Sequence, residues 1–122
     1  MKILIVDDSR LSRQWAIQAL PTTLFRQAEI LEADNGEDAV KIYKENKPDL
    51  VLMDITMPKK NGFEALEEIC KLDSDAFVVM VSADRQKLTK DRVLELGAKD
   101  ILYKPIDQEI LRDVLLAHIK KG

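Results

Sequence analysis

The sequence predicts an α/β domain in which a parallel sheet is covered by helices on both faces. Five short apolar runs alternate along the 122 residues with five segments of helical period. The run over residues 50–53 is apolar at every position, as expected of a parallel strand that is buried on both faces. No Gly/Ser-rich linker divides this alternating pattern, so we expect one domain over residues 1–122.

Polar caps and helix breakers set the expected boundaries of the elements. Residues 7–9 can cap the first helix, and Pro21 stops it. Asn35 can cap the second helix, and Gly97 suits the C-terminal end of the fourth. The expected strands cover residues 3–6, 28–33, 50–53, 77–81 and 101–103; the expected helices cover 10–20, 36–45, 62–72, 86–96 and 108–120, and residues 22–27 form a connector.

The apolar positions of each element indicate which face it buries. In the first helix Leu11, Trp15 and Ala19 recur at helical spacing and are expected to pack inward. The second strand carries Glu29 and Glu32, which favours a place at the edge of the sheet. The later helices also have expected inward positions. These are Ala39, Val40 and Tyr43 in the helix over 36–45; Phe63, Leu66, Ile69 and Cys70 in the helix over 62–72; and Ile110, Leu111, Val114 and Leu115 in the helix over 108–120.

Composition and charge narrow the class of protein. With 46% apolar and 34% charged residues the chain can bury a core, which excludes a disordered tail. The net charge of −3 argues against direct binding of nucleic acid. The single cysteine, Cys70, cannot form an internal disulfide. No apolar run suits a signal peptide or approaches the ~20 residues of a membrane span, so we expect a cytoplasmic protein without membrane contact.

Polar side chains follow four of the five expected strands: Asp7 and Asp8, Asp54, Ser82, and Lys104. Because the carboxyl ends of parallel strands share one edge of a sheet, we expect these groups to converge there. Two like charges ~4 Å apart repel by about 4 kcal/mol at an effective dielectric of ~20. Lys104 alone cannot balance three carboxylates, so a hard divalent cation with oxygen ligands, Mg²⁺, is predicted.

A carboxylate beside Mg²⁺, an ammonium group and a hydroxyl is suited to phosphoryl transfer. Asp54 can act as the nucleophile by forming an aspartyl phosphate. The metal and Lys104 would neutralise charge on the phosphoryl oxygens, and Ser82 would donate a hydrogen bond to one of them.

Each of these residues, taken alone, could also have a purely structural role. Residues 7–8 could serve as a helix cap, Asp54 as a turn residue, Ser82 as a cap, and residues 104–105 as an ordinary loop. All four structural interpretations would have to be true at the same edge of the sheet, so a functional site is the favoured interpretation. Other residues are interpreted as structural: Cys70 and Trp15 as packing, Lys59-Lys60 as a solvated loop, and His118 beside Lys120-Lys121 as a partner of the helix dipole.

In order and spacing these residues resemble the receiver domain of two-component response regulators, of the stand-alone chemotaxis type. The resemblance covers the full chain and implies a flavodoxin-like three-layer α/β/α sandwich with strand order 2-1-3-4-5 and five helices. It rests on Asp7-Asp8, Asn35-Gly36, Asp54, Met57-Pro58, Gly62, Ser82-Ala83, Gly97-Ala98 and Lys104-Pro105.

The resemblance implies a role for each matching residue of the acidic site. Asp54 would accept the phosphoryl group from a phosphohistidine on a sensor histidine kinase or a phosphotransfer protein. Asp8, Asp54 and the backbone carbonyl of Thr56 would bind Mg²⁺ directly, and Asp7 would act mainly through bound water.

The same resemblance implies how the phosphoryl group is read. Lys104 would pair with it, Ser82 would turn towards it, and the Lys104-Pro105 bond would be cis. Binding of a downstream protein would change on the face formed by the fourth helix, the fifth strand and the fifth helix. Such a chain catalyses only its own phosphorylation and dephosphorylation, and is not an enzyme with a separate substrate.

The chain departs from the family at one position of the switch. Receivers usually have an aromatic residue three positions before the lysine, where this chain has Ile101. Tyr103 lies on the same face of the strand, so either the aromatic toggle is absent or Tyr103 partly replaces it. Thr56 and Asp84 occupy the two positions that tune hydrolysis of the acyl phosphate in the family.

Four functions can be considered for these residues. The first is a stand-alone phosphorylation switch, and the second is a receiver cut from a longer regulator. The third is a Mg²⁺-dependent phosphohydrolase of the haloacid-dehalogenase type, which would need Asp-x-Asp after the first strand where this chain has Asp7-Asp8-Ser9. The fourth, a receiver that works without phosphorylation, is disfavoured by the complete set of acid, hydroxyl and lysine.

Overall fold

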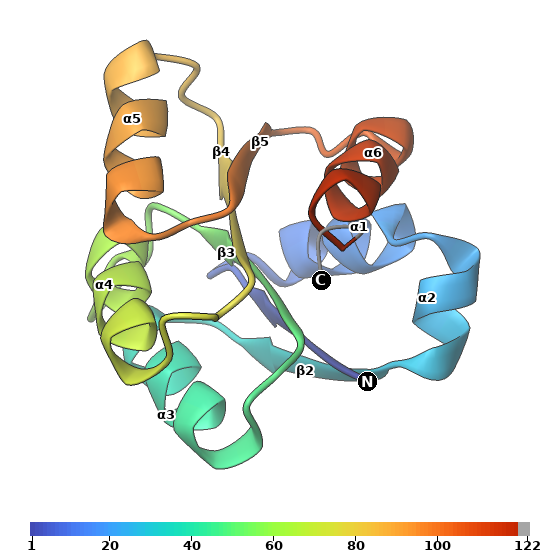
Figure 1. The fold of residues 1–122 in the computed structure, drawn as a ribbon, viewed down its shortest axis with the longest axis horizontal. Helices are drawn as coiled ribbons and strands as arrows, with labels where there is room; N and C mark the ends of the chain where they lie inside the picture. The colour runs from blue at the N-terminus through green and yellow to red at the C-terminus, as the bar shows by residue number, and fades with distance from the viewer. Residues whose placement is uncertain (120–122) are drawn as a thin grey trace.

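A computed structural model describes residues 1–119, without the side chains of residues 24, 25 and 119, as a five-stranded parallel sheet between two layers of helices (Figure 1). The strands are β1 (Lys2–Val6), β2 (Glu29–Ala33), β3 (Leu50–Asp54), β4 (Val78–Ser82) and β5 (Asp100–Tyr103), in the order β2-β1-β3-β4-β5. The helices are α1 (Arg10–Ala19), α2 (Thr22–Gln27), α3 (Gly36–Asn46), α4 (Gly62–Leu72), α5 (Lys87–Leu96) and α6 (Gln108–Ile119).

The predicted sandwich, its strand order and its five principal helices are confirmed. The difference is α2, a short helix in the segment expected to be a connector. That segment contains no glycine or proline to prevent a helical turn, and six residues are too few to show a helical period. The expected extension of the last helix to Lys120, and the Lys120-Lys121 pair, lie outside the described residues.

Alternation along the strands divides the core into two layers. Leu4 and Val6 of β1 join the cluster under α3, α4 and α5, whereas Ile3 and Ile5 join the cluster under α1 and α6. Figure 1 shows these two sets of helices on opposite sides of the sheet. The strands are therefore held on both faces, and their carboxyl ends are left as the place for a site.

The faces expected for α1 and α6 are confirmed only in part: Ala19, Leu111 and Leu115 are buried as expected, but three large side chains expected to face inward are exposed. Leu11 and Trp15 are 54% and 56% exposed, because α1 packs on the sheet through the small residues Ala16 and Ala19. In α6 Ile110 is 54% exposed, although the residue that follows it is buried. Successive helical residues point about 100° apart, so a large side chain next to a buried residue can still face solvent.

Helix ends agree with the local signals in the sequence. The Ser9 side chain accepts from the backbone N–H of Ser12, and the Asn35 side chain accepts from that of Asp38. Gly97 ends α5 with a φ of 117°, a conformation that side-chain-bearing residues rarely adopt. Within residues 1–119 no helix is both long and apolar enough to cross a membrane.

Candidate metal and phosphoryl-acceptor site

The carboxyl edge of the sheet, where all five parallel strands end, brings the predicted acids together. Asp7 and Asp8 follow β1, and Asp54 is the last residue of the neighbouring strand β3. Their carboxylates offer ligand atoms that all lie within 4.8 Å of one another. Asp7 and Asp54 are buried and Asp8 is exposed, so the cluster is open to solvent on the side of Asp8.

Lys104 brings an ammonium group to the same cluster from the end of β5. Its Nζ donates a hydrogen bond to Asp7 Oδ2 at 2.8 Å and lies 3.5 Å from Asp54 Oδ1. These four side chains thus carry three potential negative charges and one positive charge. The excess of negative charge is the condition under which a divalent cation is stabilising.

The pKa values of Asp54 and Lys104 reflect both their burial and the charges around them. Burial and the charge of Asp7 raise the pKa of Asp54 to about 6, although Lys104 acts in the opposite direction. Burial alone would lower the pKa of Lys104, but its hydrogen bond to Asp7 and the charge of Asp54 outweigh this effect and raise it. Lys104 therefore remains an ammonium group. Asp54 is a carboxylate at neutral pH, but ionising it in the folded protein costs more free energy than ionising an exposed aspartate.

The donor set fits Mg²⁺, which prefers carboxylate oxygens and retains several waters. Asp7 has both side-chain oxygens engaged: Oδ1 accepts from the backbone N–H of Ser9 at 2.9 Å, and Oδ2 accepts from Lys104. Direct binding of Mg²⁺ by Asp8 and Asp54, and a contact of Asp7 through water, stay predictions. Thr56 lies in the exposed part of the loop after β3, and its carbonyl as a ligand stays a prediction.

Ser82 is the last residue of β4 and is buried beside the end of β5. Its Cα partner across the ladder is Tyr103, and its carbonyl accepts from the backbone N–H of Lys104 at 2.9 Å. The Ser82 hydroxyl oxygen accepts from the backbone N–H of Asp84 at 2.9 Å. In this structure the hydroxyl therefore holds the loop between β4 and α5.

A cavity of about 290 Å³ opens beside the acidic cluster, between α1 and the segment that joins β5 to α6. Asp54 and Lys104 line it together with apolar residues, among them Trp15 and Ile106. The exposed Trp15 thus borders the site. The cavity gives an incoming group access to Asp54 from the side of α1.

Tyr103 and Ile101 lie on the same face of β5, as the alternation predicts. Ile101 is buried in the core under α5, and Tyr103 is half-buried against it. The guanidinium of Arg85, in the loop before α5, lies 4.8 Å from the centroid of the Tyr103 ring. The Lys104-Pro105 peptide bond is cis, as expected from the resemblance.

Two residues near the site, Arg13 and Lys60, make contacts that were not predicted from the sequence. Arg13 donates from Nη1 to the Asp7 carbonyl at 2.7 Å and from Nε to Glu32 at 2.9 Å, so it ties α1 to the ends of β1 and β2. Lys60, expected in a solvated loop, pairs with Glu68 of α4. Its carbonyl also accepts from the backbone N–H of Gly36 at 2.9 Å. Arg13 lies one helical turn after Ser9, and this spacing could have indicated that its side chain is near the end of β1. No pattern in the neighbouring sequence indicates the contacts of Lys60.

Comparison with known proteins agrees with this geometry. The family model of the response regulator receiver domain matches residues 3–116. The chemotaxis protein CheY of Thermotoga maritima is 41% identical over 104 residues, which are 85% of each chain. CheY of Bacillus subtilis is 42% identical over 108 residues, which are 88% of each chain.

Solved structures give the same result. A complex of CheX and CheY with BeF₃ and Mg²⁺ from Borrelia burgdorferi has a TM-score of 0.86 and 31% identity, and the match covers 98% of this chain and 89% of that chain. The receiver fold, the converging acids and these similarities lead to one conclusion: the chain belongs to the response regulator receiver family and is of the CheY type.

Proposed function

We propose that the chain is a phosphorylation switch whose acceptor is Asp54. A phosphohistidine on a sensor histidine kinase or a phosphotransfer protein would supply the phosphoryl group in a Mg²⁺-dependent reaction. The observation that carries the proposal is the position of Asp54, buried at the end of β3 with two further carboxylates and the ammonium of Lys104 around it. The similar CheY from Borrelia burgdorferi, solved with BeF₃ and Mg²⁺, supports ligands of the same class here.

The transfer step follows from the donors at the site. An Asp54 carboxylate oxygen forms a bond to phosphorus while the N–P bond of the phosphohistidine breaks, and the electron pair of that bond stays on the imidazole. Mg²⁺ held by Asp8, Asp54 and the Thr56 carbonyl would neutralise charge on the phosphoryl oxygens. Lys104, already 3.5 Å from Asp54, donates to one of those oxygens.

The Ser82 hydroxyl connects the acceptor to α5. It now accepts from the Asp84 N–H, and the Asp84 carboxylate accepts from the N–H of Gln86 at 2.9 Å and from the Thr89 hydroxyl at 2.7 Å. If Ser82 turns to donate to the phosphoryl group, Asp84 is released and the first turn of α5 loses this support. We propose that the face formed by α5, β5 and α6 then changes its affinity for a protein partner.

The remaining features of the function are also proposals. The chain would act as a cytoplasmic receiver domain whose chemistry is limited to its own phosphorylation and dephosphorylation. Its partners would be the phosphoryl donor and a downstream protein, without direct contact to nucleic acid or membrane. The acidic net charge of −3 supports the exclusion of nucleic acid.

Intact-mass spectrometry after incubation with acetyl phosphate tests the proposal. We expect one added phosphoryl group on the wild-type protein with Mg²⁺, and none without Mg²⁺ or on Asp54→Asn. Rapid hydrolysis of the product could hide the adduct, so the same samples are titrated with beryllofluoride and followed by NMR. A wild-type protein that shows neither a phosphoryl adduct nor a response to beryllofluoride contradicts the proposal.

A further inference from the structure

The loop between β3 and α4, residues 55–61, is fixed at two points. At its base, the backbone N–H of Gly62 donates to the Ile55 carbonyl at 2.7 Å. At its far end, the backbone N–H of Gly36, the first residue of α3, donates to the Lys60 carbonyl at 2.9 Å. The loop carries Thr56, whose carbonyl is the predicted third protein ligand of Mg²⁺.

The contact between Gly36 and Lys60 depends on the absence of a side chain. A Cβ atom at Gly36 would lie 2.1 Å from the Lys60 carbonyl oxygen and 2.7 Å from its carbonyl carbon. These are backbone atoms, so the conflict cannot be relieved by a change of rotamer. Any larger residue at position 36 must therefore push the loop away from α3.

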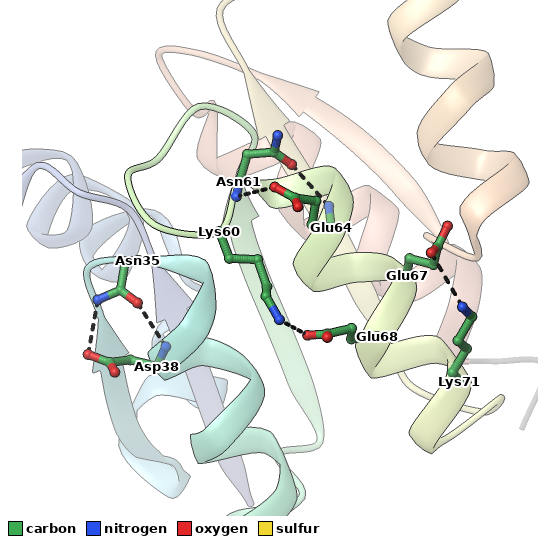
Figure 2. Close-up of polar contacts among 8 residues, drawn as sticks. All are labelled: Asn35, Asp38, Lys60, Asn61, Glu64, Glu67, Glu68 and Lys71. Atoms are coloured by element: carbon green, nitrogen blue, oxygen red, sulfur yellow. Dashed lines mark hydrogen bonds and ion pairs between the residues drawn. The ribbon is translucent and has the colours of Figure 1, made fainter.

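Contacts from α4 hold the same end of the loop, as Figure 2 shows. The Lys60 ammonium pairs with Glu68 of α4, and Lys60 is partly buried. The next residue, Asn61, forms a capping box with Glu64: each side chain accepts from the backbone N–H of the other residue, at 3.0 and 3.2 Å. The end of the loop is thus held from α3 on one side and from α4 on the other.

We propose that Gly36 and Lys60 are positioning residues for the Mg²⁺ site. By anchoring the loop they hold the Thr56 carbonyl at the carboxylates of Asp8 and Asp54, although neither residue touches the metal. This inference rests on the proposed function, because it assigns a role towards the Mg²⁺ that phosphorylation would require. Residues that orient metal-binding groups without touching the metal strongly affect the affinity for the metal, because a mobile group must be ordered when the metal binds.

The test is the affinity for Mg²⁺, measured by titrating ¹⁵N-labelled protein with MgCl₂ and following backbone amide shifts. Gly36→Ala is expected to weaken Mg²⁺ binding by about tenfold. Gly97→Ala is the matched control, because its Cβ would lie 2.6 Å from Cys70 Sγ, at the end of α5 and at the opposite edge of the sheet. It should lower stability but leave the affinity for Mg²⁺ unchanged.

A second pair of variants tests the side-chain part of the anchor. Glu68→Gln removes the negative charge that pairs with Lys60, and we expect Mg²⁺ to bind about two- to fivefold more weakly. Glu67→Gln makes the same change of charge one residue earlier and breaks the exposed pair with Lys71, 3.4 Å apart (Figure 2). This control should bind Mg²⁺ like the wild-type protein.

The outcomes separate the two proposals. If the wild-type protein shows no Mg²⁺-dependent shifts at residues 7, 8 and 54, the proposed function itself fails. If the wild type binds Mg²⁺ and a folded Gly36→Ala protein binds it equally well, the anchor is excluded and the function stands. If Gly36→Ala does not give the spectrum of a folded protein, the comparison of Glu68→Gln with Glu67→Gln decides, and equal affinities overturn the proposal.

Discussion

At the scale of single residues, the negative charge of Asp54 lowers the stability of the folded protein when no metal is bound. Its folded-state pKa is raised from 3.8 to about 6 by burial and by Asp7. A carboxyl group with a raised pKa contributes stability that is fully present below pH ~4 and is lost as the pH rises through about 6. The metal-free protein should therefore lose stability over this interval.

Asp54→Asn should remove this loss, because an amide stays neutral at every pH. At pH 7.5 in EDTA we expect the variant to be more stable than the wild type by about 2 kcal/mol, and at pH 4.5 the difference should shrink towards zero. Urea unfolding at the two pH values measures both. A difference that is the same at pH 4.5 and at pH 7.5 would show that the effect does not come from the charge of Asp54.

Tyr103 makes a prediction of its own at this scale. The Arg85 guanidinium lies over its ring, 4.8 Å from the ring centroid. Tyr103→Phe should therefore keep the response of the loop after β4 to beryllofluoride, whereas Tyr103→Leu should reduce it. NMR shifts of residues 83–86 report the response. Loss of the response in Tyr103→Phe would instead assign the role to the hydroxyl.

At the scale of elements, α5 has a thin buried face. Val93 is its buried residue, while Leu88 is 78% exposed. Its first turn is supported by the Asp84 carboxylate, and Asp84 is held in turn by the Ser82 hydroxyl. Few buried apolar contacts mean that little packing free energy opposes a shift of this helix.

Hydrogen exchange should detect the shift that we propose for α5. Addition of beryllofluoride and Mg²⁺ is expected to speed exchange in a peptide covering residues 83–92, because the Asp84 N–H loses its acceptor. A peptide from α4, whose capping box is independent of Ser82, serves as the internal control. Ser82→Ala should bind beryllofluoride without the added exchange. An equal response in Ser82→Ala would contradict the connection through this hydroxyl.

The elements themselves were predictable because their signals are local. Helix caps at Ser9 and Asn35 and the glycine at position 97 lie next to the boundaries that they set. The buried face of α1 was not predictable in the same way. Helical spacing assigned Ala19 to this face correctly but also assigned Leu11 and Trp15 to it, whereas Ala16 packs because a small residue lets the helix approach the sheet.

At the scale of the whole molecule, the topology assembles the site. Parallel strands β1, β3, β4 and β5 are consecutive neighbours, so residues at their ends were predicted to meet even though they are far apart in sequence. Contacts that come from the loops and from helix faces could not be found this way. Arg13 and the pairing of Gly36 with Lys60 depend on how α1, α3 and the loop after β3 settle against one another.

Mg²⁺ should stabilise the whole domain through this site. A ligand that binds only the folded state adds about 2.7 kcal/mol at a hundredfold excess over Kd, and Asp8→Asn should lose most of this gain. Asp113→Asn, an exposed acid on α6, is the control and should keep it. Thermal unfolding with EDTA and with MgCl₂ measures the difference. Equal stabilisation of all three proteins would point to nonspecific binding of the ion.

The central claim is that Asp54 receives the phosphoryl group, and trapping the acyl phosphate tests it most directly. Borohydride reduces an aspartyl phosphate to homoserine, which peptide mass spectrometry can place in the sequence. After acetyl phosphate and Mg²⁺ we predict homoserine at position 54 in the peptide that spans β3 and its following loop. Homoserine at position 7 or 8, or unmodified Asp54 in a protein that has gained a phosphoryl group, would contradict the account.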